Sequence, residues 1–168
     1  MIQTQKAVTI NHKEVIKNLV DLIAKGNAHV SLDKALHGIP FSLLGEKPGG
    51  LPYSIWQLAE HIRISQWDIL EFSRNSKHVS PEWPGGYWPT ESAPGSERAW
   101  QNCIDAIRDE RNAFIELIKN AGADLNKVFE YGDGQSLLKE ALVLADHNSY
   151  HTAEIIIIRR LLNAWSNT

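Results

Sequence analysis

The stretch LLKEALVLADHNSYHTAEIIIIRRLL, residues 137–162, decides the fold because its apolar side chains recur with helical spacing along its whole length. Intervals of three and four residues return a side chain to the same face of an α-helix at every turn. The four consecutive isoleucines at 155–158 would alone suit a β-strand, but the uninterrupted stripe favours one long helix buried on most sides. That stripe comprises Leu137, Ala141, Leu144, Asn148, His151, Ile155, Ile158 and Leu162.

Three further segments carry the same periodicity, and glycine and proline separate them. The first follows Asn11, pauses at residues 25–27 and resumes in AHVSLDKAL (28–36), where Ser31 can start a new turn. The second opens at Pro52/Ser54 and runs to residue 72. The third follows the N-cap Ser96, ends at Gly122 and carries Arg111 in its otherwise apolar stripe.

These four helices, without any convincing pair of strands, predict an all-α chain, most economically a single domain over residues 1–168 built as an antiparallel four-helix bundle. The long connection between the second and third helices contains SPEWPGGYWPTESAPG (80–95). Trp83, Tyr87 and Trp88 are large apolar surfaces that seek partners, so we expect this loop to pack over one end of the bundle. There it either plugs exposed core or forms a lid over a pocket.

Composition excludes several classes of function. A net charge of −3 and a pI near 6.1 leave no basic excess for a phosphate backbone, so no nucleic-acid partner is expected. The first ten residues, MIQTQKAVTI, lack a secretory pattern and the longest apolar run stops at Arg159, which predicts a cytoplasmic protein without a membrane span. The single cysteine, Cys103, excludes an internal disulfide and any thiolate cluster. A metal site would therefore use His, Asp or Glu.

His147 and His151 form the most chemical feature of the chain. Side chains four residues apart on a helix have Cβ atoms about 5–6 Å apart, so two imidazoles can converge on one ion. Asn148 stands where the zinc-protease motif HExxH has its glutamate. His151 lies in the buried stripe, where an unpaired polar group costs a few kcal/mol. His61 sits beside the apolar seam of the second helix and is a third candidate.

From spacing alone, a three-histidine metal site and a set of hydrogen-bonded core histidines are supported equally. The remaining histidines have weaker claims. His29, near the break in the first helix, could line a pocket. His12, His37 and His78 lie at predicted helix ends or in a polar turn, and we do not expect them to bind a metal.

Three stretches together carry a family resemblance: LPYSIWQLAEHIRISQWDILEF (51–72), SPEWPGGYWP (80–89) and GDGQSLLKEALVLADHNSYHTAEIIIIRRLL (132–162). With the AHVSLDKAL segment they span nearly the whole chain, which resembles the DinB/YfiT-like bundle proteins. The resemblance implies a four-helix bundle, commonly a homodimer, that holds a divalent metal through His61, His147 and His151. Three histidines suit Zn, Ni or Fe, so the ion is left open.

The resemblance also implies a class of function. Relatives in the superfamily include S-transferases and an isomerase that use low-molecular-weight thiols. A metal-dependent transferase or hydrolase acting on an unidentified small molecule is therefore expected. A non-catalytic metal- or ligand-binding module with a role in stress response is the alternative.

Two carboxylates are candidate proton handlers. The family often has a glutamine where this chain has Glu154, three residues after His151. Glu154 could be a fourth ligand, an acceptor for an imidazole N–H or a general base, or it could point to solvent and pair with an arginine. Asp68 lies seven residues past His61 on a similar face, and a salt bridge to a basic neighbour is the favoured alternative to catalysis there.

Overall fold

The computed structural model describes residues 11–165, and these residues form five α-helices and four 3₁₀ turns. The MIQTQKAVTI segment lies outside the described residues. Within 11–165 the only β-type pairing is an isolated bridge between Val128 and Ser136, so the all-α prediction is confirmed. The α-helices are α1 (His12–Lys25), α2 (Leu32–Leu36), α3 (Ile55–Arg74), α4 (Glu97–Ala121) and α5 (Leu137–Leu161); the 3₁₀ turns are η1 (Phe41–Leu43), η2 (Pro48–Gly50), η3 (Gly85–Tyr87) and η4 (Gly122–Asn126).

Serine residues start four of the five α-helices, as local sequence predicts. Each serine hydroxyl accepts the backbone N–H three residues ahead, which pairs a donor that the first helical turn leaves free. The four caps are Ser31, Ser54, Ser96 and Ser136. Gly26 ends α1 in the left-handed conformation at φ 67°, which places the break between α1 and α2 where the sequence indicated it.

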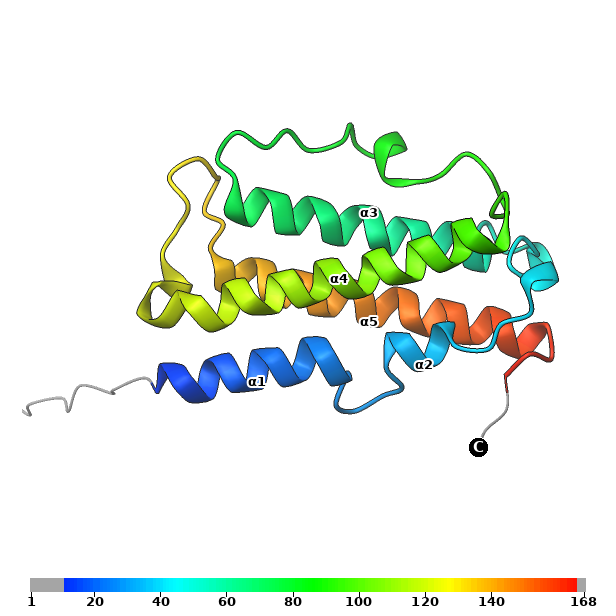
Figure 1. The fold of residues 1–168 in the computed structure, drawn as a ribbon, viewed down its shortest axis with the longest axis horizontal. Helices are drawn as coiled ribbons and strands as arrows, with labels where there is room; N and C mark the ends of the chain where they lie inside the picture. The colour runs from blue at the N-terminus through cyan, green and yellow to red at the C-terminus, as the bar shows by residue number, and fades with distance from the viewer. Residues whose placement is uncertain (1–10, 166–168) are drawn as a thin grey trace, which may run out of the picture.

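The connection between α3 and α4 runs back along the whole length of α3 (Figure 1). Hydrogen bonds fix this path: His78 contacts Asp68 near the end of α3, and Ser54 at its start donates to the carbonyl of Ser92 at 2.5 Å. Between them, Gln57 donates to the carbonyl of Pro89. The loop therefore covers a side of α3, which differs from the position over one end of the bundle that the sequence predicts.

Because the chain returns before α4 begins, α3 and α4 run in the same direction. The side-chain amide of Gln66, late in α3, donates to the carbonyl of Ile107 in the middle of α4 at 2.6 Å. In Figure 1, α1, α3, α4 and α5 lie side by side, with α2 continuing along α5 beyond the end of α1. The 22-residue connection, 75–96, carries the chain back to the start of α3 before α4 begins. The α3–α4 pair is therefore parallel, and the bundle is not uniformly antiparallel.

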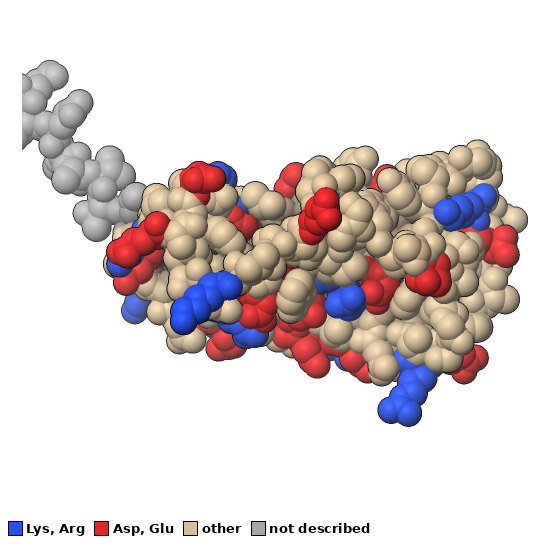
Figure 2. Space-filling model, turned by 90° about the horizontal axis from the view of Figure 1, so that it is seen from above, with Lys and Arg blue, Asp and Glu red and all other residues tan. Residues whose placement is uncertain are grey.

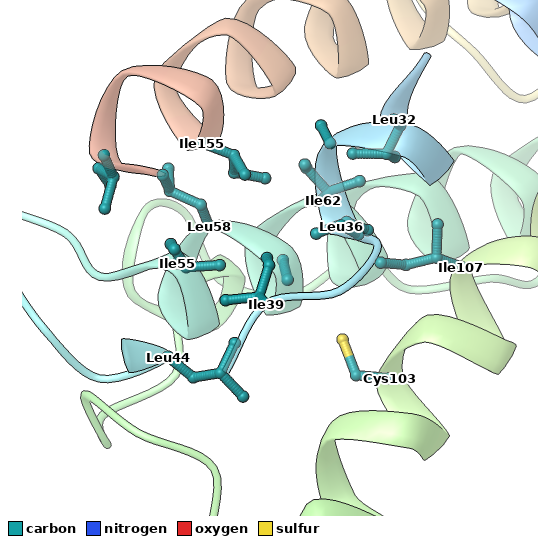
Figure 3. Packing of buried hydrophobic residues seen from close by; sticks show 13 residues of the cluster. Leu32, Leu36, Ile39, Leu44, Ile55, Leu58, Ile62, Cys103, Ile107 and Ile155 are labelled. Atoms are coloured by element: carbon teal, nitrogen blue, oxygen red, sulfur yellow. The ribbon is translucent and has the colours of Figure 1, made fainter. Parts of the chain in front are cut away.

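Two clusters of buried apolar residues hold the helices together. The first lies at the α2 end, where Leu58, Ile62 and Ile155 meet residues of α2 and α4 (Figure 3). The second surrounds Phe114 of α4, which is fully buried. The histidines of α3 and α5 lie on helices that these clusters hold rigidly, and this rigidity matters for a site built from two helices.

The surface matches the composition. On the face seen in Figure 2, Lys and Arg side chains are scattered among Asp and Glu side chains, with no continuous basic patch. No helix in the described part of the chain is long and apolar enough to cross a membrane.

Candidate metal centre

The structure brings His61 of α3 together with His147 and His151 of α5. One potential donor atom from each imidazole lies within 4.8 Å of the other two. The Nε2 atoms of His61 and His147 are 3.0 Å apart. His61 and His151 are buried and His147 is partly buried. The convergence inferred from the i,i+4 spacing and from the position of His61 in its helix is therefore present.

The outward nitrogen of each ring faces an oxygen. The Nδ1 of His61 is 2.9 Å from the carbonyl of Tyr87, and the Nδ1 of His151 is 2.6 Å from Oε2 of Glu154. The Nδ1 of His147 faces Oδ1 of Asn148 at 3.5 Å, a weak contact. The 3.5 Å contact does not fix the proton of His147. At the other two rings a carbonyl or carboxylate oxygen accepts, so Nδ1 carries the proton and Nε2 keeps its lone pair. This is the tautomer in which Nε2 binds a metal.

Burial keeps the three rings neutral. Burial first, and then the proximity of other histidines, lowers the pKa of His147 and of His151 to about 4. Burial likewise lowers the pKa of His61. At neutral pH the cluster therefore presents uncharged imidazoles, the state that coordinates a metal ion.

The loop after α3 supplies a wall that orients His61. Trp88 lies flat on the His61 ring, with centroids 3.8 Å apart and planes 2° from parallel. Its other face stacks on Tyr53 at 3.9 Å. The aromatic YWP motif signalled that this loop packs against something, but the sequence did not indicate that its partner is a histidine of the cluster.

Asp68 anchors that loop. One carboxylate oxygen accepts the hydroxyl proton of Tyr87 at 2.6 Å, and the other is 2.7 Å from Nε2 of His78. Burial, with Asp68 beside the phenol, raises the pKa of Tyr87 to about 12. Asp68 is not among the groups that converge with the three histidines. The basic neighbour that Asp68 contacts is His78 of the loop, ten residues away, through a hydrogen bond, and not a Lys or Arg.

Glu154 contacts His151 and is not part of the three-histidine donor cluster. Of the roles open from sequence, the one that the structure displays is an acceptor for an imidazole N–H. Its side chain is 34% exposed, and burial raises the pKa of its carboxyl group. Glu154 also borders a small cavity of about 130 Å³ whose other walls are apolar: Leu51, Pro52, Tyr53, Leu58, Ile157 and Ile158.

A buried amide ties the helices of the site together. Gln66 is fully buried, donates to α4 through the carbonyl of Ile107, and accepts from the side chain of Asn148 on α5 at 3.1 Å. Asn148 is the residue after His147, so this bridge fixes the height of α5 against α3. Sequence reasoning placed Asn148 in the buried stripe but did not identify its partner.

His29 lies away from the cluster, at a separate cavity beside α5. That placement agrees with its expected position at a pocket. His12, His37 and His78 also stand apart from the three converging rings.

The structure shows a helical chain in which two helices share a three-histidine cluster. A comparison with protein families identifies the family of such a chain. The chain matches the DinB superfamily over residues 28–155 and belongs to that superfamily. No curated protein and no solved structure matches the chain.

Proposed function

We propose that the protein is a divalent-metal-dependent enzyme that acts on a small molecule, with the ion bound by the Nε2 atoms of His61, His147 and His151. Zn, Ni and Fe all suit three neutral imidazoles. The observation that carries the proposal is the convergence of three ring nitrogens whose opposite nitrogens each face an oxygen acceptor.

The donor set suits an ion. The Nε2 atoms of His61 and His147 approach to 3.0 Å, and the Nδ1 contact of His61 leaves its Nε2 with a lone pair. With His147 protonated at Nδ1 as well, both lone pairs can be directed at one cation. Three protein ligands also leave coordination positions open, which is characteristic of catalytic and not of closed structural sites.

The chemistry follows from what a bound divalent ion supplies, namely a lowered pKa for a coordinated water or thiol. The chain's own groups would do the rest. Glu154 holds the N–H of His151 and, with a raised carboxyl pKa, is placed to take up or release a proton beside the site. The apolar cavity that it borders would receive a compact group of the substrate.

The position of Trp88 and Tyr53 favours a reaction shielded from water on one side. The stacked pair covers one face of His61, so that substrate approaches from elsewhere. This arrangement suits transfer of a thiol to an electrophile, in which bulk water competes, and the thiol transfer known among superfamily members supports the same choice. Hydrolysis of a small ester or amide is the other reaction that the proposal includes.

We also infer a cytoplasmic homodimer of one bundle domain per chain. The outer side of α5 exposes Val143, Tyr150, Ile157 and Leu161 at 45%, 64%, 49% and 54%. Large apolar side chains gathered on one helix are typical of a protein interface. Light scattering of a Tyr150→Glu variant tests this inference, because a charge in that face should yield monomers.

The activity test uses chelator-treated protein reloaded with Zn²⁺, Ni²⁺ or Fe²⁺ and assayed on panels of thiol-plus-electrophile and ester substrates. Turnover should require the ion and should be lost in His61→Ala. It should persist in His37→Ala, which alters an exposed histidine outside the cluster. Turnover that survives chelation would contradict the proposal, as would its absence from every metal-loaded sample.

A further inference from the structure

A second cavity, of about 390 Å³, lies on the side of α5 that faces α1 and α2. Its origin is the break between those helices. α1 ends at Lys25 with Gly26 as its C-cap, and α2 begins only at Leu32, so a short turn replaces a helix over this part of α5 (Figure 1). At φ 67°, Gly26 lets the ring of His29 fold back against the turn, where an added Cβ would lie 3.0 Å from that ring.

The cavity has the composition of a small-molecule site. Its volume is within the range of about 300–1,000 Å³ that ligand pockets occupy. Apolar side chains form most of the wall, among them Leu22 and Ile23 of α1, Leu32 of α2 and Leu144 of α5. Such a wall excludes water and binds an apolar body.

One charged group lines this cavity from within the core. Arg111 of α4 is only 7% exposed, and its Nη2 donates to Oδ2 of Asp33 at 2.8 Å. This is the only hydrogen bond of its side chain within residues 11–165. A guanidinium has five N–H donors, so most of them remain available toward the cavity. Asp33 is itself half exposed, which weakens its neutralisation of the buried charge.

The other polar groups at this cavity are already committed or exposed. Thr152 donates to the carbonyl of Asn148, and the Asn148 amide donates to Gln66. The Nδ1 of His29 donates to the carbonyl of Val30, so its Nε2 accepts from the hydroxyl of Ser149 at 2.9 Å.

Asp146 is the remaining charged residue of the lining, and it is exposed. Ser31 also lines the cavity, and its hydroxyl oxygen accepts the N–H of Lys34 as the N-cap of α2. The buried charge at the cavity is therefore that of Arg111. It offers donors and positive charge.

We propose that this cavity binds a small monoanionic molecule with an apolar body, such as a medium-chain or aromatic carboxylate. The carboxylate pairs with the free edge of Arg111, and the apolar body lies against α1 and α5. The exposed His29 and its bond to Ser149 border the entrance. None of the three clustered histidines lines this cavity, so the site is separate from them and does not depend on the proposed metal.

Hexanoate, hexanol and hexylamine serve as matched probes of equal chain length. Each is titrated into chelator-treated protein while backbone amide shifts are followed by NMR, so that carboxylate binding to a metal cannot contribute. Hexanoate should bind saturably, with shifts centred on residues 22–32 and 142–152, and hexanol should bind about tenfold more weakly or worse. Hexylamine should not bind.

Variants separate charge from shape. Arg111→Met should weaken hexanoate binding by about tenfold or more, whereas Arg108→Met, which removes an exposed arginine of the same helix, should leave it unchanged. Ala24→Phe fills the cavity without altering charge and should abolish binding even if Arg111→Met fails to fold. Equal affinity for hexanoate and hexanol would overturn the proposal, as would equal effects of the two arginine variants, shifts centred elsewhere, or no saturable binding.

Discussion

Replacing Glu154 by alanine tests how the proposed site holds its ligands. The carboxylate accepts the Nδ1 proton of His151 at 2.6 Å and thereby fixes the tautomer and the rotation of that ring. Without it, His151 can protonate at Nε2 or turn away, and both changes remove a donor from the ion. We therefore expect Glu154→Ala to bind metal more weakly without changing the number of sites.

The size of the effect follows from the geometry. Loss of a partner that orients a metal ligand typically costs 10- to 100-fold in affinity. The Glu154 side chain is 34% exposed, and solvent screens part of its charge, which argues for the lower end of that range. The expected loss is about tenfold, equivalent to about 1.4 kcal/mol. Glu154→Gln keeps an oxygen acceptor and should lose less.

A competition titration against a chromophoric zinc chelator measures these affinities directly. Glu116→Ala is the matched control, because Glu116 pairs with Lys119 on the exposed side of α4. The order of affinity should be wild type and Glu116→Ala together, then Glu154→Gln, then Glu154→Ala. Wild-type affinity in Glu154→Ala would refute the reasoning that His151 depends on this carboxylate.

Three other perturbations test the core, the loop and a buried acid. Phe114→Ala should lower the free energy of unfolding by about 3–5 kcal/mol in urea titrations, because the ring is fully buried. Phe41 is 39% exposed, so Phe41→Ala should lower the free energy of unfolding by less than about 1 kcal/mol. Similar losses in the two variants would contradict the assigned core. Trp88→Ala removes the ring stacked on His61 and should weaken zinc binding several-fold in the same titration; unchanged affinity would show that the stack does not orient the ligand. Burial raises the pKa of the Glu110 carboxyl group to about 7. The stability that this group contributes is therefore complete below pH 4.5 and is lost as pH rises through 7; the loss is about 1–3 kcal/mol after allowance for its partial exposure. Glu110→Gln should flatten the dependence of melting temperature on pH between pH 4.5 and 7, and an unaltered profile would show that other groups cause that dependence.

Local signals predicted the helices well because the information lies within a few residues. The serine caps and the left-handed Gly26 act through hydrogen bonds three or four residues away, and the apolar stripe of α5 needs only its own spacing. The i,i+4 relation of His147 and His151 is of the same kind. These features depend on helical geometry alone, whatever the surroundings.

The features that sequence reasoning missed depend on contacts across long separations. The parallel course of α3 and α4 follows from the path of the loop between them, which no periodicity encodes. The stacking of Trp88 on His61 and the anchoring of Tyr87 by Asp68 join residues 27 and 19 positions apart. Arg111 had a usable signal, since a charged residue within an apolar stripe must find a partner or face a cavity.

The most direct test of the account is the metal content of the protein purified without a metal-affinity column. Elemental analysis of the wild type should find about one equivalent of a divalent transition metal per chain, since the three-histidine site can hold one ion. The His61→Ala/His147→Ala double variant should contain almost none while keeping its helical circular dichroism spectrum. Equal metal content in the two folded proteins, or none in either after growth and reconstitution with Zn, Ni and Fe, would contradict the claim that these imidazoles share an ion.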